Sequence, residues 1–306
     1  MTDTRTDLKP PLLAACAITK GFPGVWEHLI LDHIDFDVRA GEVHTLLGEN
    51  GAGKTVIANI LSGYYAKTGG DVRVNGEVVN LTSPRDGLAH GIAMVHQELM
   101  LVPAFTVAQN VMVGLDAPAF SFEIQAVQDK LAALSTRYGL QVDPRARVEN
   151  LSAGEQQRVE ILKVLYHEPK VLLLDEPTSL LTPGEADHLF IVLRAMADDG
   201  KGVVFITHKM REVFAVSDRV TVLKLGKTQG TQRISETTVE ALTRKTFGEL
   251  VPDYMPRPPT RSSENAVVLD NVVPAGTAEQ SRPASINLTI RTVSYTHLTL
   301  PTNREV

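Results

Sequence analysis

Short apolar runs separated by polar turns recur along most of the chain and predict alternating strands and helices. Residues 29–38 alternate between apolar and polar positions, as an antiparallel strand with one exposed face does. Residues 71–79 contain Asn75-Gly76, the strongest short signal for a hairpin. Four shorter runs rich in aliphatic residues predict buried strands: residues 42–47, 92–95, 171–174 and 203–206.

A helical pattern replaces the strand pattern between about residues 98 and 166. Five residues there fall on one face of a helix that Gly139 would end: Ile124, Val127, Leu131, Leu134 and Tyr138. The alternation then resumes, with a helix around 189–196, a closing hairpin from residue 220 and a last helix at 239–247. We therefore predict an α/β fold with a mixed central sheet, an antiparallel β subdomain and a helical insert at about 98–166.

A glycine-rich motif lies between the predicted strand at 42–47 and a predicted helix at 56–61: Gly48-Glu49-Asn50-Gly51-Ala52-Gly53-Lys54-Thr55. It fits G-x-x-x-x-G-K-[ST], the phosphate-binding loop. At such a junction, backbone N–H groups and the helix dipole attract an anion, and glycines let the backbone approach it. Lys54 would reach the β- and γ-phosphates of a nucleotide, and the Thr55 hydroxyl would bind Mg²⁺.

Two carboxylates, Asp175 and Glu176, end the predicted strand at 171–174. This arrangement suits phosphoryl chemistry, because the first can hold Mg²⁺ through water and the second can accept a proton from an attacking water. A separate motif, Leu151-Ser152-Ala153-Gly154-Glu155, opens another helix with Ser152 as N-cap. Helix N-termini bind phosphate, although an ordinary capped helix would have the same sequence.

Composition limits the possible partners. The 306 residues carry a net charge of −6 and no long basic run, which argues against nucleic acid. The single Cys16 excludes a disulfide framework and suits a reducing compartment. No run approaches the ~18 consecutive apolar residues of a membrane span, so a membrane role would require a partner. Residues 1–11 are polar and are expected to be a disordered lead-in.

Together the motifs resemble the ATP-binding cassette of ABC transporters, a type of phosphate-loop NTPase. The match spans residues 12–250 and adds Gln97 and His208, each after a predicted strand. Details such as Met94-Val95-His96-Gln97 and residues 154–161 resemble importers of simple sugars and nucleosides. The resemblance implies an ATPase at the cytoplasmic face of the membrane. Its partners would be permease subunits, indirectly a substrate-binding protein, and a second cassette that shares ATP.

The resemblance also implies roles for individual residues. Phe22 would stack on adenine, although a core phenylalanine is an alternative. Gln97 would contact Mg²⁺ and the attacking water, and His208 would hold the γ-phosphate. Ser152 and Gly154 would bind the γ-phosphate held by the opposite cassette. The run Met100-Leu101-Val102-Pro103 would form part of a groove for a membrane subunit, with simple core packing as the alternative.

The chain departs from the family pattern at several positions. Ala153 and Glu155 replace Gly and Gln of the usual Leu-Ser-Gly-Gly-Gln, and Glu155 adds negative charge near a phosphate. Thr182 replaces the usual Asp after the two acids, which puts communication across the dimer in doubt. A soluble, non-transport cassette acting on ribosomes or DNA is the alternative function. DNA-repair cassettes insert coiled coils or zinc modules between the two phosphate motifs. The segment between residues 48 and 151 contains no heptads and no cysteine pairs, which does not favour this type.

The C-terminal part repeats the plan of the N-terminus. After a proline-rich linker at 251–265, residues 266–270 and 286–291 resemble 12–18 and 34–39 and would begin a second cassette. The first copy reaches its phosphate loop nine residues after Arg39, whereas no glycine follows Arg291. Residues 292–306 resemble a translated sequencing adapter and are expected to be a non-native tail, with a divergent native sequence as the alternative.

Overall fold

The computed structural model describes residues 10–22, 29–115, 124–248, 265–272 and 286–291. The chain divides into two compact units, residues 1–250 and residues 251–306. The expected lead-in before residue 10, nearly all of the linker and the tail at 292–306 lie outside the described residues. Among the helices that are described, none is both long and apolar enough to cross a bilayer.

The larger sheet of the first unit has six strands in the order β10-β9-β3-β8-β7-β6. Five of them are parallel, and only β10 runs antiparallel to its neighbour. The four strands predicted to be buried are confirmed as β3, β6, β7 and β8. The bounds are β3 (Val43–Leu47), β6 (Ile92–Val95), β7 (Val171–Asp175), β8 (Gly202–Thr207), β9 (Arg219–Lys224) and β10 (Lys227–Arg233).

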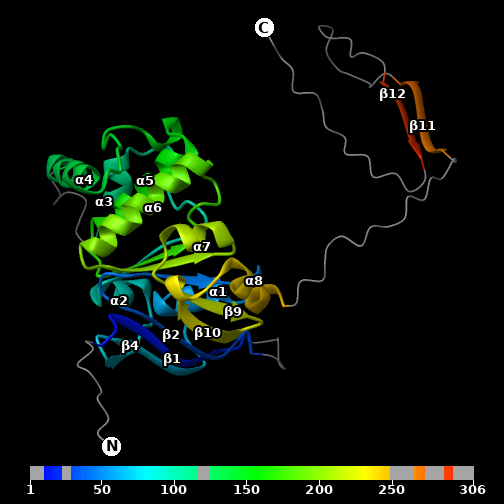
Figure 1. The fold of residues 1–306 in the computed structure, drawn as a ribbon. Coiled ribbons are helices and arrows are strands. Elements are labelled where there is room, and N and C mark those ends of the chain that lie inside the picture. Colours follow the sequence, from blue (N-terminus) through cyan, green and yellow to red (C-terminus); the bar gives the residue numbers. More distant parts are fainter. Residues whose placement is uncertain (1–9, 23–28, 116–123, 249–264, 273–285, 292–306) are drawn as a thin grey trace, which may run out of the picture. The chain divides into compact units, whose positions relative to one another are not determined.

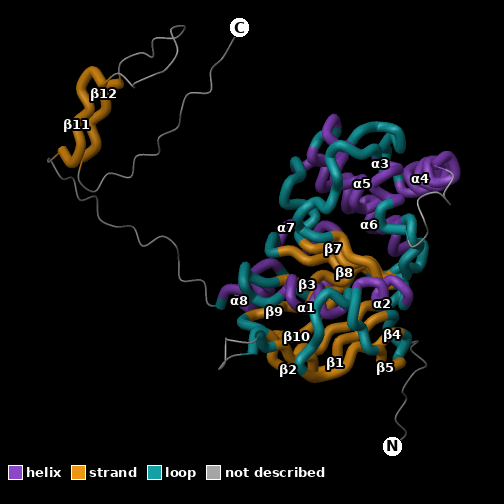
Figure 2. The backbone as a smooth tube through the Cα atoms, turned by 180° about the vertical axis from the view of Figure 1, so that it is seen from behind, coloured by secondary structure: helices purple, strands orange, loops and turns teal. Residues whose placement is uncertain are grey.

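The smaller sheet is antiparallel, with the order β2-β1-β4-β5. It is the predicted β subdomain, and the turn at Asn75-Gly76 joins β4 to β5 as expected. Its strands are β1 (Leu13–Lys20), β2 (Leu31–Val38), β4 (Gly69–Val74) and β5 (Glu77–Val79). Helix α1 (Lys54–Leu61) lies between the two sheets (Figure 2).

Two hydrophobic clusters cover opposite faces of the six-stranded sheet, because successive side chains of a strand point to opposite sides. In β7, Leu173 belongs to the cluster around α1, whereas Leu172 and Leu174 belong to the cluster beneath the helical region. Figure 1 shows that region at the end of the unit opposite the smaller sheet. Its helices are α3 (Val107–Met112), α4 (Ile124–Tyr138), α5 (Ala153–Leu165) and α6 (Pro183–Asp198), with the 3₁₀ turn η2 (Val148–Asn150).

The predicted helical insert is confirmed by α3, α4 and α5, with one local difference. Val127, Leu131 and Tyr138 of α4 are buried, but Ile124 is 43% exposed because it stands at the first turn of the helix. Sequence reasoning did not identify α2 (Pro84–Ala89) or α7 (Met210–Val216), although Ser83 and Asp86 form a recognisable capping box before α2. The 3₁₀ turn η3 (Ile234–Glu236) and α8 (Val239–Phe247) complete the unit, and α8 agrees with the last predicted helix.

The second unit contains the hairpin β11 (Asn265–Val272) and β12 (Ile286–Arg291). One irregularity of its register, a bulge with one extra residue on the first strand, also occurs between β1 and β2. The paired positions are Ala15–Phe36 and Ile18–Ile34 in the first hairpin, and Leu269–Leu288 and Val272–Ile286 in the second.

Each hairpin has a hydrogen bond of the same kind at the extra residue of its first strand, the bulge residue. The bulge residue has a left-handed backbone in both, with φ 49° at Ala17 and φ 50° at Asn271. Its backbone N–H donates to a side-chain oxygen on the opposite strand. The acceptor is Oδ1 of Asp35 for Ala17, at 2.8 Å, and Oδ1 of Asn287 for Asn271, at 2.6 Å. Ala17 is a poor residue for this conformation, whereas Asn271 adopts it more readily.

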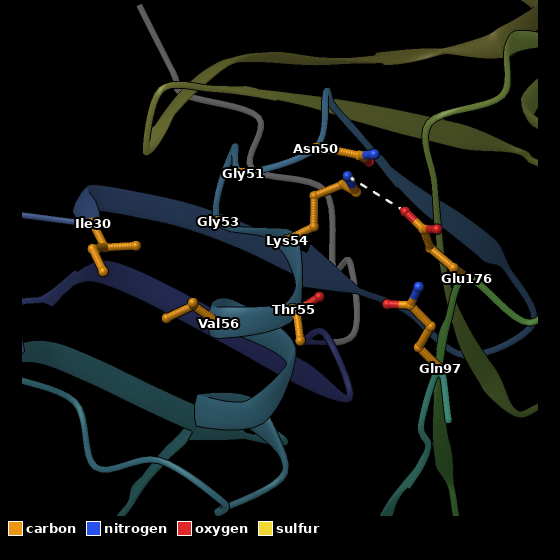
Figure 3. A pocket seen from close by; sticks show the side chains of 9 residues that line it. All are labelled: Ile30, Asn50, Gly51, Gly53, Lys54, Thr55, Val56, Gln97 and Glu176. Carbon is orange, nitrogen blue, oxygen red and sulfur yellow. Dashed lines mark ion pairs between the residues drawn. The ribbon is translucent and has the colours of Figure 1, made fainter. Parts of the chain in front are cut away.

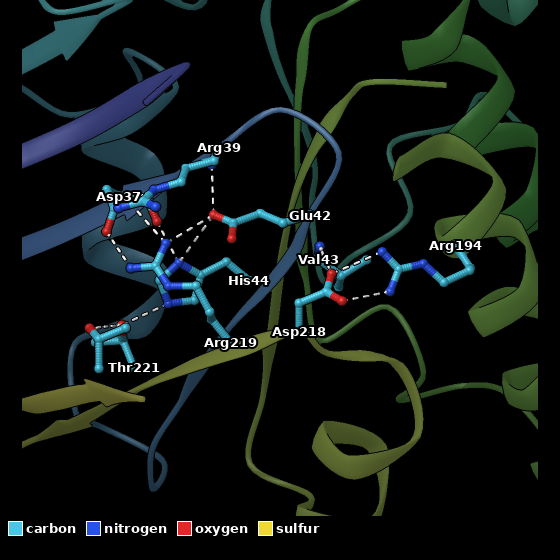
Figure 4. Close-up of polar contacts among 10 residues, drawn as sticks. Asp37, Arg39, Glu42, Val43, His44, Arg194, Asp218, Arg219 and Thr221 are labelled. Carbon is cyan, nitrogen blue, oxygen red and sulfur yellow. Dashed lines mark hydrogen bonds and ion pairs between the residues drawn. The ribbon is translucent and has the colours of Figure 1, made fainter. Parts of the chain in front are cut away.

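A buried polar network joins the smaller sheet to the base of the larger one (Figure 4). His44 of β3 is 0% exposed; its Nδ1 contacts the Asp37 carbonyl oxygen, and its Nε2 lies 2.8 Å from the Thr221 hydroxyl. Arg219 donates to Asp37 at 2.8 and 3.0 Å and to Glu42 at 3.0 Å. Burial, with the nearby Arg219 charge, lowers the pKa of His44 from 6.5 to about 4, so the imidazole is neutral at pH 7.

This network predicts an acid-sensitive step in stability. Below pH 6.5 the unfolded chain protonates His44 while the folded chain resists until about pH 4, so the free energy of unfolding falls across that window. The largest loss is about 3 kcal/mol, partly offset by Glu42, whose pKa burial raises. Urea unfolding of His44→Gln should therefore depend less on pH between 6.5 and 4. An unchanged pH dependence would contradict this account.

Candidate functional site

A cavity of about 420 Å³ opens at the carboxyl ends of the parallel strands. Figure 3 shows its side chains, which come from the loop after β3, the start of α1, the ends of β6 and β7 and the residue before β2. The lining residues are Ile30, Asn50, Gly51, Gly53, Lys54, Thr55, Val56, Gln97 and Glu176. The phosphate loop, Gln97 and Glu176 thus meet although they are far apart in the sequence, because parallel strands end at one edge of the sheet.

Two glycines of the loop are required by the surrounding chain. A Cβ at Gly48 would lie 2.4 Å from the Leu223 carbonyl oxygen, which is closer than any real contact. Gly53 has φ 104° and would bring a Cβ 2.6 Å from the side chain of Leu31. The glycines therefore allow the loop to pack on β9 and β2, in addition to exposing its backbone N–H groups.

Lys54 is positioned by the loop itself. Its side chain is only 5% exposed, and Nζ donates to the carbonyl oxygens of Gly48 and Glu49 at 2.9 Å each. Nζ also lies 3.8 Å from Oε1 of Glu176, the ion pair drawn in Figure 3. Burial lowers the pKa of Lys54, while Glu176 and Asp175 favour the charged ammonium. The Lys54 ammonium is thus held against the backbone of the phosphate loop.

Asp175 ends β7 in a buried position, with 1% of the residue exposed. Neither carboxylate oxygen has a hydrogen-bond partner in the described part of the chain. The Thr55 hydroxyl lies near enough to favour the charged form without a hydrogen bond of standard geometry, yet burial raises the pKa of Asp175. An unpaired buried carboxylate beside a hydroxyl is what a hard cation such as Mg²⁺ would satisfy.

Glu176 and His208 are directly in contact. Nδ1 of His208 lies 3.0 Å from Oε1 of Glu176, and their side chains are 40% and 15% exposed. The Glu176 backbone is left-handed, with φ 45°, and its N–H donates to the Ile206 carbonyl oxygen at 3.0 Å. Because Pro177 follows, this conformation is unfavourable, and such strain is concentrated at functional sites.

Comparison with known proteins agrees with this geometry. Residues 31–179 match the family model for ABC transporters. The chain carries an ABC transporter ATP-binding domain. Solved structures support the fold: a nucleotide-free ATP-binding cassette from an ABC transporter superposes with a TM-score of 0.66 at 23% identity over 73% of this chain and 91% of its own. A dimeric cassette bound to ADP and Pi gives 0.63 at 22% identity, covering 72% and 98%.

Relatives of the ATP-binding domain are import proteins. A glucose import ATP-binding protein of Haloferax volcanii is 38% identical over 92% of this chain and 56% of its own. A nucleoside import ATP-binding protein of Lactococcus lactis is 42% identical, covering 72% and 44%. A ribose import ATP-binding protein of Streptomyces avermitilis is 44% identical, covering 80% and 47%. The chain thus spans about half the length of these relatives.

The remaining candidate residues of the ATP-binding domain lie around the cavity or away from it. Gln97 follows β6, is exposed and lines the cavity. Phe22 is not among the lining residues; its ring packs edge-on against Tyr65 at 5.7 Å, and Lys20 Nζ lies 4.6 Å from its centre. Ser152 and Gly154, at the start of α5, do not line the cavity either.

The start of α5 carries a capping box in which Glu155, one of the departures from the family pattern, is the second partner. The Ser152 backbone N–H and hydroxyl both donate to Oε2 of Glu155, at 2.9 and 2.8 Å. These contacts lower the pKa of Glu155, so the carboxylate is charged at pH 7. A Cβ on Gly154 would lie 2.0 Å from Oε1 of Glu185, so a second carboxylate adjoins the same helix start. Two donors that could bind a phosphate are already occupied.

Glu155→Gln should therefore strengthen interaction with a phosphate at this helix start. The amide removes one negative charge and weakens the hold on the Ser152 hydroxyl. We expect ATP hydrolysis by the dimeric form to rise about two- to tenfold, as for a partly exposed charge pair. Phosphate release measured at saturating ATP tests this, with Glu149→Gln, an exposed glutamate near Arg147, as the control. A rate equal to that of the control would refute the competition.

Proposed function

We propose that this chain is the ATP-hydrolysing subunit of an ABC importer for simple sugars or nucleosides, working at the cytoplasmic face of the membrane. The observation that carries the proposal is the similarity to three import ATP-binding proteins, for glucose, nucleosides and ribose. The cavity supports it, because a cationic phosphate loop faces a buried carboxylate and a second, strained one. A substrate-binding protein would deliver the solute indirectly.

Nucleotide binding follows from the loop. The backbone N–H groups of residues 48–55 would surround the phosphates, and Lys54 would exchange its carbonyl partners for the β- and γ-phosphate oxygens. Thr55, Asp175 and Gln97 would hold Mg²⁺, whose chemistry is to neutralise charge on the phosphates. Phe22 remains a candidate for adenine, with Tyr65 beside it.

Hydrolysis would depend on Glu176 and His208. Glu176 can accept a proton from a water aimed at the γ-phosphate, because it lines the cavity and lies between Lys54 and His208. The contact between His208 Nδ1 and Oε1 of Glu176 fixes the direction of the carboxylate. An imidazole protonated on both nitrogens would also donate from Nε2 to the γ-phosphate. Ser152 and Gly154 would bind the γ-phosphate held by an opposite cassette, since they lie outside this cavity.

The segment after Gln97 is the proposed contact with the permease. Met100 and Val102 are 54% and 40% exposed, whereas Leu101 packs partly on the core of the helical region. Lys163 of α5 donates to the Met100 carbonyl oxygen at 2.9 Å, so the segment is tied to the helix that Ser152 caps. Movement of a docked permease would thereby reach the nucleotide.

This contact predicts crosslinking to a membrane protein. A single cysteine at Val102, in a Cys16→Ser background, should crosslink to a permease loop in membranes from cells that express the complete transporter. Cysteine at Val78, which is 57% exposed on the other sheet, should not. Equal capture by both positions, or by neither, would contradict the docking surface.

We also propose that residues 266–291 begin a second cassette. The extra residue, its left-handed backbone and its side-chain hydrogen bond support this proposal, because one distinctive bulge recurs where the sequence repeat predicts it. The second cassette would supply the opposite helix N-terminus for the first site.

The transport function can be separated from the ribosomal or DNA-binding alternative. The full-length protein should co-purify with membrane permeases encoded near it, and its ATP hydrolysis should rise when these are reconstituted with sugar or nucleoside and the binding protein. Capture of ribosomes or DNA, with no effect of permeases, would overturn the proposal.

A further inference from the structure

A buried carboxylate behind the cavity joins the two loops that carry the catalytic candidates. Glu212 lies on α7 and is 6% exposed. Its Oε1 accepts a hydrogen bond from the Thr178 hydroxyl, and its Oε2 accepts one from the Thr207 hydroxyl, each at 2.6 Å. Lys209 Nζ lies 3.1 Å from Oε1 and completes the cluster. The carboxylate is thus fully engaged but does not line the cavity.

The two threonines have defined positions relative to the site. Thr178 comes two residues after Glu176, and Thr207 immediately precedes His208. Thr178 follows β7, and Thr207 is the last residue of β8, the neighbouring parallel strand. Glu212 therefore clamps the end of one strand to the end of the next, at the point where Glu176 and His208 contact each other.

The strain at Glu176 explains why such a clamp is needed. A residue with φ 45° before a proline persists only where the surrounding structure holds it. On the N-terminal side, the Glu176 N–H is bound to the Ile206 carbonyl oxygen at 3.0 Å. On the C-terminal side, the hold comes through Thr178, whose hydroxyl donates to Glu212 and whose carbonyl oxygen lies 3.4 Å from Lys209 Nζ.

We infer that Glu212 is a positioning residue for hydrolysis, acting through Thr178 and Thr207 on Glu176 and His208. This inference rests on the proposed ATPase function. It requires that Glu212 affect the step in which the water is activated, while nucleotide binding is left intact, because Lys54 and the phosphate loop are not in contact with the clamp. A displacement of about 1 Å at a reacting group can lower a rate about 100-fold.

The test compares variants of both ends of the clamp in the full-length transporter. Glu212→Ala and Thr178→Val should each lower kcat about 10- to 100-fold with KM for ATP unchanged. Thr178→Ser retains the hydroxyl and should restore most of the rate. If Glu212→Ala fails to fold, the isosteric Thr178→Val still decides the matter. Hydrogen–deuterium exchange should show faster exchange of the Glu176 amide in Thr178→Val than in Thr178→Ser.

Two further variants separate this inference from others. Glu42→Gln alters a buried carboxylate at the opposite edge of the sheet and should leave kcat unchanged. In single-turnover assays, Glu212→Ala should cost less when Glu176→Gln is already present, because part of its effect acts through the Glu176 carboxylate. Equal kcat for Thr178→Val and Thr178→Ser, or additive losses, would overturn the role of Glu212. Normal turnover by Glu176→Gln and Lys54→Ala would instead reject the proposed function itself.

Discussion

Glu176→Gln should bind ATP as tightly as the unchanged protein and hydrolyse it about 100- to 10,000-fold more slowly. The amide keeps the shape of the side chain and can remain next to His208, but it cannot accept a proton from water. Loss of the carboxylate also removes the ion pair with Lys54, so the ammonium can contact phosphate more freely. Equilibrium binding of ATP and phosphate release in the hydrolysing assembly measure the two effects separately.

Glu168→Gln is a matched control for this change. Glu168 also has a left-handed backbone, with φ 54°, and an ion pair, with Lys130 at 2.7 Å, but it lies before β7 at the opposite edge of the sheet. The Glu168→Gln variant should hydrolyse ATP at the rate of the unchanged protein. Normal turnover by Glu176→Gln would show that another group accepts the proton.

Lys54→Ala should lower ATP affinity at least about 100-fold. Each hydrogen bond between a charged donor and a phosphate contributes about 1.5–3 kcal/mol, and Lys54 is placed to make one to each of two phosphates. The loss should be larger for ATP than for AMP, which lacks both groups. Calorimetric titration with ATP, ADP and AMP would resolve this order.

Lys201→Ala provides the comparison for Lys54. Lys201 is partly buried, its pKa is also lowered by burial, and it donates to a backbone carbonyl, that of Pro169, at 2.9 Å. Because it precedes β8, at the far end of the strand from the cavity, its loss should cost stability but not ATP affinity. Equal ATP affinity in the two variants would reject the role of Lys54.

Much of the site could be predicted from sequence because its chemistry is local. The phosphate loop specifies its own turn, and Asp175 and Glu176 follow a strand with an unmistakable apolar run. Their meeting with Gln97 follows from one rule, that parallel strands end at the same edge. The capping boxes at Ser152 and Ser83 were likewise present in the residue pattern, although only the first was recognised as a helix start.

The contacts that sequence did not predict are those made across long separations. Nothing near His44 indicates that Thr221 and Arg219 would enclose it. Glu212 looks like an ordinary helical glutamate until the ends of β7 and β8 place two threonines around it. Phe22 was expected at the nucleotide, but its ring contacts Tyr65, a residue far from it in the sequence. Pattern and spacing cannot rank such alternatives, since each depends on tertiary contacts.

The left-handed backbone of Glu176 implies a conflict between durability and catalysis. Glycine at this position would relieve strain of about 1–3 kcal/mol, a gain that few single substitutions offer. It would also remove the carboxylate proposed to activate water. Selection or engineering for heat resistance alone would thus favour an inactive protein, so searches for thermostable variants of this cassette need a screen for turnover at every round.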